Sequence, residues 1–298
     1  MKKLIFILII FLQFVRSQPI QHSQHDSLFL GIERKTLLNY SLVAYSLSSF
    51  YIEYQWWWKG NYNDFKFGND GFLNNYSLGV DKAGHFYTSY LYFNVLYECM
   101  EWGGFDEQTK LITAIAIPTF YALSIELNDG FTAYSFSGLD LTANMLGIGY
   151  GVLQRQFPLL QKFKFKWSYY PSGIITVGAK NKFPIASDYD GHIYWLSIDV
   201  HGVLPNGMKE YWPRFLNLAV GYGAKNISHQ KYWLGGFNPN IPQSRNFAVS
   251  LDYNLGSFDI EDDFLYNIRN IVDYFHFPAP GIRKIEHQSA EFKPLLVN

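Results

Sequence analysis

The chain has 298 residues and a formal net charge of −1, with 24 Lys and Arg against 25 Asp and Glu. This balance excludes the proteins that bind nucleic acid through a strong basic excess. Aromatic residues make up 19% of the chain against 16% charged residues. Because Tyr and Trp collect where one side of a surface is apolar and the other is wet, this composition indicates association with a membrane.

The N-terminus is typical of a secretory signal peptide, since two lysines are followed by an apolar run over residues 4–15. The run is shorter than the about 20 apolar residues that a membrane span needs. We expect cleavage after Ser17 or Gln18, so that residues 1–18 are the signal peptide and residues 19–34 a flexible N-terminus. The protein is therefore expected to be exported, to the periplasm or the outer membrane.

Cys99 is the one cysteine in the sequence. It cannot form a disulfide within a single chain, and no cysteine directly after the signal peptide is present to carry a lipid. Because Cys99 falls in an apolar helical stretch, we interpret it as a small buried hydrophobic residue.

Apolar residues recur at helical spacing throughout the first half of the chain. Four helices are expected, over residues 35–58, 80–102, 107–127 and 138–155. A stretch rich in Asn, Gly and Asp over residues 60–75 indicates a loop. None of the four is a clean membrane span, and together they form a predicted helical domain over residues 35–160.

After Pro158 the pattern changes from the helical period to strict alternation, which is typical of antiparallel strands with one buried face. The expected strands lie at residues 174–177, 193–200, 216–223 and 247–255, and a later helix at 259–275. The prediction is an α+β protein, with a bundle of about four helices followed by an antiparallel sheet and a C-terminal helix in the region 161–298. Two arrangements of the sheet remain open: it packs on the helices, or it faces lipid.

Polar residues interrupt the apolar helices at three places. Residues four apart share one helix face, which pairs Asp81 with His85 and Asp140 with Asn144. Buried carboxylates are costly unless they are paired or bound to a ligand, and short connections make successive helices neighbours. We therefore expect these side chains to meet in one cluster. The candidate site residues are Asp81, His85, Glu126, Asp129, Asp140 and Asn144.

Three glycines, Gly147, Gly149 and Gly151, alternate within the fourth helix. No strand precedes them, so they do not predict a nucleotide-binding loop. We interpret them as a face on which another helix packs closely.

The motifs around the polar residues resemble a known family when they are taken in order. D-K-A-G-H-F at 81–86, then Glu126 with D-G-F at 129–131, then S-G-L-D-L-T-A-N-M-L-G at 137–147 are similar to the YfiM-like family of predicted periplasmic lipoproteins. VanZ-like membrane proteins show a similar D-K-x-x-H-F segment, a later Glu and a D-x-x-x-N-x-x-G helix. The resemblance covers residues 35–157 and implies an envelope location, but no activity.

Two functions follow from the polar residues. In the first, the protein has a structural or binding role in the envelope, and the polar residues form a buried network. In the second, it is a membrane-surface hydrolase or transferase acting on a lipid or lipid-linked substrate. There His85 would be the acid and base, oriented by Asp81, with Glu126, Asp129 and Asp140 as further acid and base groups or metal ligands. The pattern identifies no cofactor, and carboxylates suit a hard cation. The expected partner is a membrane lipid or envelope component, with no nucleic acid.

Overall fold

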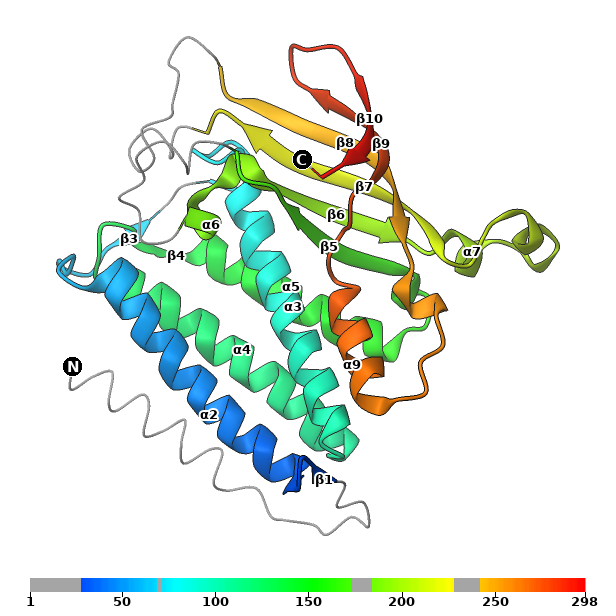
Figure 1. The fold of residues 1–298 in the computed structure, drawn as a ribbon. Coiled ribbons are helices and arrows are strands. Elements are labelled where there is room, and N and C mark those ends of the chain that lie inside the picture. The colour runs from blue at the N-terminus through cyan, green and yellow to red at the C-terminus, as the bar shows by residue number, and fades with distance from the viewer. Residues whose placement is uncertain (1–27, 69–70, 173–183, 228–241, 298) are drawn as a thin grey trace.

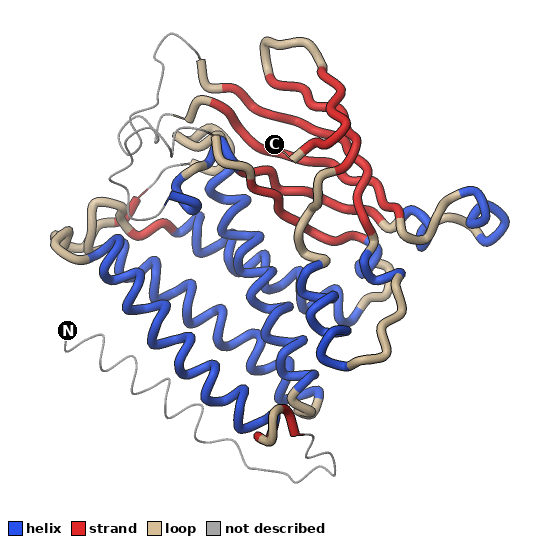
Figure 2. The backbone as a smooth tube through the Cα atoms, viewed as in Figure 1, coloured by secondary structure: helices blue, strands red, loops and turns tan. Residues whose placement is uncertain are grey.

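The computed structural model describes residues 28–68, 71–172, 184–227 and 242–297. The predicted signal peptide and the strand expected at 174–177 lie outside these ranges. A group of long helices lies beside an antiparallel sheet (Figures 1 and 2). The α+β fold class is confirmed, with helices first and the sheet second.

The four expected helices are present. They are α2 (Arg34–Glu53), extended by the π-helix η1 (Tyr54–Trp58), α3 (Val80–Trp102), α4 (Glu107–Asp129) and α5 (Gly138–Gln156). Two of them begin at side chains that satisfy free backbone N–H groups: the carboxylate of Asp106 accepts from Thr109, and the hydroxyl of Ser137 accepts from Asp140. Of the expected flexible N-terminus, residues 28–33 form a small hairpin of strands β1 (Leu28–Phe29) and β2 (Ile32–Glu33).

Helices α3 and α5 pack closely because α5 presents two glycines to α3. A Cβ added at Gly147 would lie 2.1 Å from the carbonyl oxygen of Phe86, and one added at Gly151 would lie 2.4 Å from the ring of Phe93. Nothing lies within 4 Å of a Cβ added at Gly149. The predicted packing face therefore consists of Gly147 and Gly151, one helical turn apart, without Gly149.

One described helix, α4, is long and apolar enough to cross a membrane by length and composition. The core helix of a soluble protein passes the same test, and α4 contributes Ala114 and Ile117 to a buried cluster with Phe93, Leu96 and Ile148. This helix alone therefore does not establish a membrane span.

The sheet has six antiparallel strands in the order β10-β9-β8-β7-β6-β5, so each strand pairs with its neighbours along the chain. The strands are β5 (Phe163–Tyr169), β6 (His192–Ile198), β7 (Leu216–Lys225), β8 (Ser244–Tyr253), β9 (Ala279–Ile285) and β10 (Glu291–Leu296). Strands β6, β7 and β8 match three expected strands. Strands β5, β9 and β10 were not predicted, and the last two follow the expected late helix, which is α9 (Asp263–Val272).

The N-terminal half of α3 connects the helices to the sheet. The ring of Phe86 lies 4.8 Å from that of Phe165 on β5, and the hydroxyl of Tyr87 donates a 2.7 Å hydrogen bond to the backbone carbonyl of Tyr274. A short parallel pair, β3 (Phe67–Gly68) and β4 (Phe136–Ser137), holds the start of α5. The N-terminal ends of α3 and α5 are thereby fixed near each other and near the sheet.

Candidate functional site

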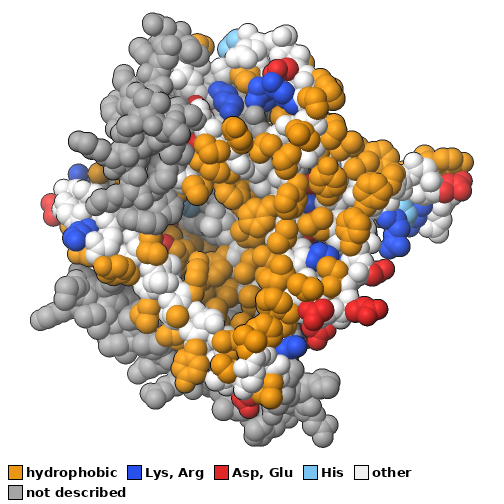
Figure 3. All heavy atoms as spheres, in the orientation of Figure 1, with side chains coloured by type: hydrophobic (Ala, Val, Ile, Leu, Met, Phe, Trp, Pro, Cys, Tyr) orange, Lys and Arg blue, Asp and Glu red, His pale blue; other side chains and the backbone are white. Residues whose placement is uncertain are grey.

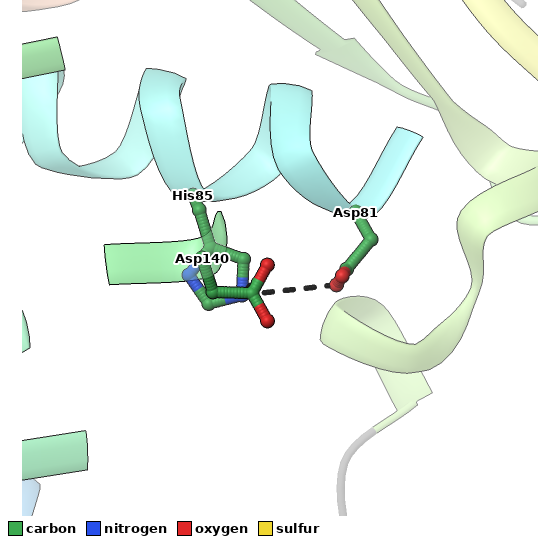
Figure 4. Close-up of side chains that lie close together, drawn as sticks. All are labelled: Asp81, His85 and Asp140. Carbon is green, nitrogen blue, oxygen red and sulfur yellow. Dashed lines mark ion pairs between the residues drawn. The ribbon is translucent and has the colours of Figure 1, made fainter. Parts of the chain in front are cut away.

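Three helix ends bring the candidate residues together. Asp81 and His85 lie in the first turns of α3, Glu126 in the last turn of α4, and Asp140 and Asn144 in the first turns of α5. Figure 4 shows the side chains of Asp81 and Asp140 on the same side of α3 as the His85 ring, with the Asp140 carboxylate overlapping the ring in this view.

The imidazole of His85 is the common neighbour of these side chains. Its Nε2 lies 3.7 Å from Oδ1 of Asp81 and 3.6 Å from Oδ1 of Asp140. Its Nδ1 lies 3.9 Å from Oε1 of Glu126 and 3.3 Å from the amide nitrogen of Asn144. When the ring is neutral, an N–H of Asn144 donates to Nδ1, and the ring proton is on Nε2, facing the two aspartates. The predicted clustering of these five residues is confirmed, and their catalytic role stays a prediction.

Lys82, which lies within the D-K-A-G-H-F motif but was not among the candidate residues, completes the cluster. Its Nζ lies 3.0 Å from Oδ2 of Asp81 and 2.5 Å from Oδ1 of Asp140, and its side chain is 1% exposed. Ligand atoms of Asp81, His85 and Asp140 lie within 4.8 Å of one another, close enough to hold a cation. The Lys82 ammonium already supplies a positive charge between the two aspartates.

One side chain and one backbone N–H from outside the three helices hold the carboxylates. The Tyr189 hydroxyl, from the 3-10 helix η4 (Tyr189–Gly191), donates a 2.9 Å hydrogen bond to Asp81. The backbone N–H of Ser137 donates to Oε2 of Glu126 at 3.1 Å. Tyr189 and Asp81 are 108 residues apart, so no local pattern in the sequence could pair them.

Asp129 lies at the margin of the cluster. Its Oδ1 accepts a 2.8 Å hydrogen bond from the indole N–H of Trp58, at the end of η1. Burial raises the pKa of Asp129 to about 6, although the Trp58 hydrogen bond and the charge of His85 act in the opposite direction. Asp129 therefore ties η1 to the end of α4.

The carboxylates of the cluster differ in their protonation. Burial raises the pKa of Glu126 to about 8, with a further rise from Asp140. Burial would also raise the pKa of Asp81, but His85, Lys82 and the Tyr189 hydrogen bond lower it below its ordinary value. Burial would lower the pKa of His85, yet Asp81, Asp140 and Glu126 together raise it. Near neutral pH, Glu126 therefore holds a proton while Asp81 is ionised.

The cluster reaches solvent chiefly through one side chain. His85 is 26% exposed, against 12% for Asp140, 9% for Asp81 and 2% for Glu126. Among these side chains, the imidazole therefore has the largest exposed fraction.

A comparison with protein families matches part of the helical half of the chain. Residues 68–156 match a family described as predicted periplasmic lipoproteins (DUF2279). No curated protein and no solved structure matches the chain. The match contains all six candidate residues and ends with α5, before the sheet begins. The match supports an envelope protein and agrees with the expected export to the periplasm or the outer membrane.

Proposed function

We propose that the protein has a structural or binding role in the cell envelope, and that the His85 cluster is an ion network joining α3, α4 and α5. The observation that carries this proposal is the position of Lys82. Its buried ammonium pairs with one carboxylate from its own helix and one from α5. A buried lysine between two aspartates holds those helices together, because separating them would leave uncompensated charges.

The narrower kinship with YfiM-like and VanZ-like proteins is part of this proposal. It is supported by the D-K-x-x-H-F segment, by Glu126 and by the D-x-x-x-N-x-x-G helix, all three of which contribute to the cluster. In this proposal, the shared motifs supply the residues that hold three helices together.

A second function has one specific observation in its favour, the exposure of His85. An imidazole that reaches solvent while Asp81 and Asp140 raise its pKa is suited to donate a proton to a leaving group, as a general acid. In this alternative, the protein is a hydrolase or transferase acting on a lipid or lipid-linked envelope substrate, and Asp81 orients the ring.

Two substitutions separate these functions. Lys82→Met removes the buried charge, and His85→Gln removes the titrating group while keeping an amide that can hydrogen-bond. For a structural network, Lys82→Met should lower the free energy of unfolding in mild detergent by about 3 kcal/mol. His85→Gln should lower it by less than about 1 kcal/mol, because the imidazole already reaches water. Lys59→Met on the exposed end of η1 is the control, and Lys82→Arg, which keeps the charge, should restore most of the loss.

The catalytic alternative predicts the opposite pattern in cells. A strain lacking the protein would be complemented with wild type or His85→Gln, and its envelope lipids compared by mass spectrometry. Loss of a lipid product with His85→Gln at wild-type stability would reject the structural proposal. Equal lipid profiles, together with a large stability loss in Lys82→Met, would support it.

A further inference from the structure

One face of the sheet is apolar; α3 packs on its β5 end, and the part over β7 to β10 meets solvent. Its register places six apolar side chains in one row across all six strands: Phe165, Leu196, Val220, Val249, Ile282 and Phe292. The last four are 52%, 54%, 53% and 64% exposed, respectively. Side chains on one face of paired strands lie side by side, so these residues form a continuous apolar band. We call the face that carries this band the outer face.

The opposite face of the sheet is buried and carries many polar side chains beside a small hydrophobic cluster that includes Ile193 and Trp195. Its buried side chains include Lys166, Ser197, Asn217, Asn246, Ser250 and Asp252. Among the described residues, buried polar and charged side chains outnumber buried hydrophobic ones. Water-soluble domains have the reverse arrangement, whereas an outward apolar face over a polar interior is what a protein in contact with lipid shows.

Helix α9 has the same arrangement, with polar side chains turned toward the protein and apolar side chains exposed. Asn267 is buried and Asn270 donates a hydrogen bond to Glu98 of α3, while Leu265 and Ile268 are 53% and 40% exposed. Figure 3 shows hydrophobic side chains as a broad field over the region where Figure 1 places α9 and the strands, with charged side chains mostly at its margins.

The charges on the outer face complement an anionic bilayer. Within the paired registers, outer-face positions carry no acidic residue, and their two charged residues are Arg245 on β8 and Lys284 on β9. Both lie at the same end of the face, on neighbouring strands, and Arg245 also pairs with Glu286 just beyond β9. An apolar surface with a basic margin matches hydrocarbon bordered by phosphate groups.

A groove between α3 and this face extends the apolar surface inward. It has a volume of about 220 Å³ and is lined by side chains that include Phe86, Tyr87, Val220 and Tyr222. Val220 belongs both to the groove and to the exposed row, so an apolar chain lying on the sheet could enter the groove without crossing a polar surface.

We propose that the outer face of the sheet is the surface through which this protein contacts a phospholipid bilayer, with Val220, Val249 and Ile282 in the acyl region and Arg245 and Lys284 at the phosphates. This inference does not use the His85 cluster, so either proposal can fail without the other.

Spin labelling tests the occupant of the face directly. In the full chain carrying Cys99→Ser, a nitroxide is attached through Val249→Cys, or through Gln288→Cys in the exposed turn between β9 and β10. The protein is then bound to vesicles of phosphatidylethanolamine and phosphatidylglycerol. Lipid contact predicts that the label at 249 collides more with oxygen than with a water-soluble nickel chelate, and that the label at 288 shows the reverse. Low collision with both reagents at 249 would mean that a second copy or another protein covers the face, and high collision with nickel would mean that water does. Either result would overturn the proposal.

Vesicle flotation tests the same face without a label. The triple variant Val220→Thr, Val249→Thr and Ile282→Thr keeps β-branched side chains on exposed positions. Its affinity for these vesicles should fall to about one tenth of the wild-type value or lower. Leu159→Thr, an exposed substitution between α5 and β5, should bind like wild type. Unchanged binding of the triple variant, with wild-type circular dichroism, would contradict the proposal.

Discussion

The two halves of the molecule each contain a buried lysine held by two aspartates, and the two networks differ in their surroundings. In the helical half, Lys82 lies between Asp81 and Asp140. In the sheet, the Nζ of Lys166 lies 2.8 Å from both Asp252 and Asp273, whose side chains are 0% and 5% exposed.

The sheet network is balanced, because Lys164 is also 2.5 Å from Asp273 and two lysines meet two aspartates. The helical network has additional acids, Glu126 and Asp129, and an imidazole that reaches solvent. A balanced buried network needs no proton to neutralise it, whereas an acid-rich one must take up protons. The comparison indicates that the sheet network serves the fold alone, and that the helical network can also respond to pH.

The largest expected effect is on the sheet network. Lys166→Met would leave Asp252 and Asp273 buried with one fewer cation, and should lower the free energy of unfolding by about 3–5 kcal/mol. Lys82→Met should cost less, because its aspartates keep His85 as a second cation. Denaturant unfolding in detergent, with Lys284→Met as the exposed control, measures both. A smaller loss for Lys166→Met than for Lys82→Met would reverse the comparison.

The second test separates the helices of the helical network without touching a charge. Gly147→Ala should push α5 away from α3, because its Cβ would meet the Phe86 carbonyl, at a cost of about 2–3 kcal/mol. Gly149→Ala is the matched control, since its Cβ meets nothing, and should stabilise the helix by up to about 1 kcal/mol. Equal melting temperatures for the two variants would show that the close approach does not hold the network.

The third test uses pH. Glu126 has its pKa raised from 4.5 to about 8 by burial, and the pKa of His85 is also raised, so the folded state holds protons that the unfolded state releases. Their stabilisation is present at low pH and is lost as pH rises through the folded-state values. The free energy of unfolding should fall by on the order of 1–3 kcal/mol between about pH 5 and 9.

Glu126→Gln should remove part of that slope, because the amide cannot ionise. Unfolding curves at a series of pH values, for wild type and this variant, measure the difference. A wild-type slope that persists unchanged in Glu126→Gln would assign the pH dependence to other buried acids.

The smallest expected effect concerns the link between the two halves. Tyr189→Phe removes the hydroxyl that donates to Asp81 and should cost about 1.5 kcal/mol, since a hydrogen bond to a charged group is lost. Tyr211→Phe, on an exposed tyrosine, is the control. A loss no larger than the control would mean that the helical network does not depend on the segment before β6.

Much of the helical site could be predicted from the sequence. Asp81 with His85 and Asp140 with Asn144 occupy single helix faces by spacing alone, and short loops make their helices neighbours. Lys82 could not be placed in this way, because its partner Asp140 lies on another helix and neighbours in a helix point in different directions. Trp58 and Tyr189 reach their carboxylates from segments whose positions follow only from tertiary packing.

Strand β5 shows where local pattern stops being informative. In F-K-F-K-W-S-Y the apolar and polar side chains alternate, which is typical of a strand with two unlike faces, although β5 was not among the predicted strands. Alternation does not say which face turns inward. Here both faces are covered. Phe165 packs on Phe86 of α3, and the lysine face is buried because Asp252, on β8, and Asp273, at the end of α9, neutralise Lys166.

The sequence by itself determined the spacing at which apolar residues recur, and hence the helices, three of the strands and the residues that share a helix face. The tertiary structure alone decided that the polar face of the sheet is buried, and that the apolar face is covered by α3 at β5 and exposed on β7 to β10. The physical reason is that a period is a property of neighbouring residues. The direction of burial depends on whether distant side chains supply the countercharges, and these come together only when the chain folds.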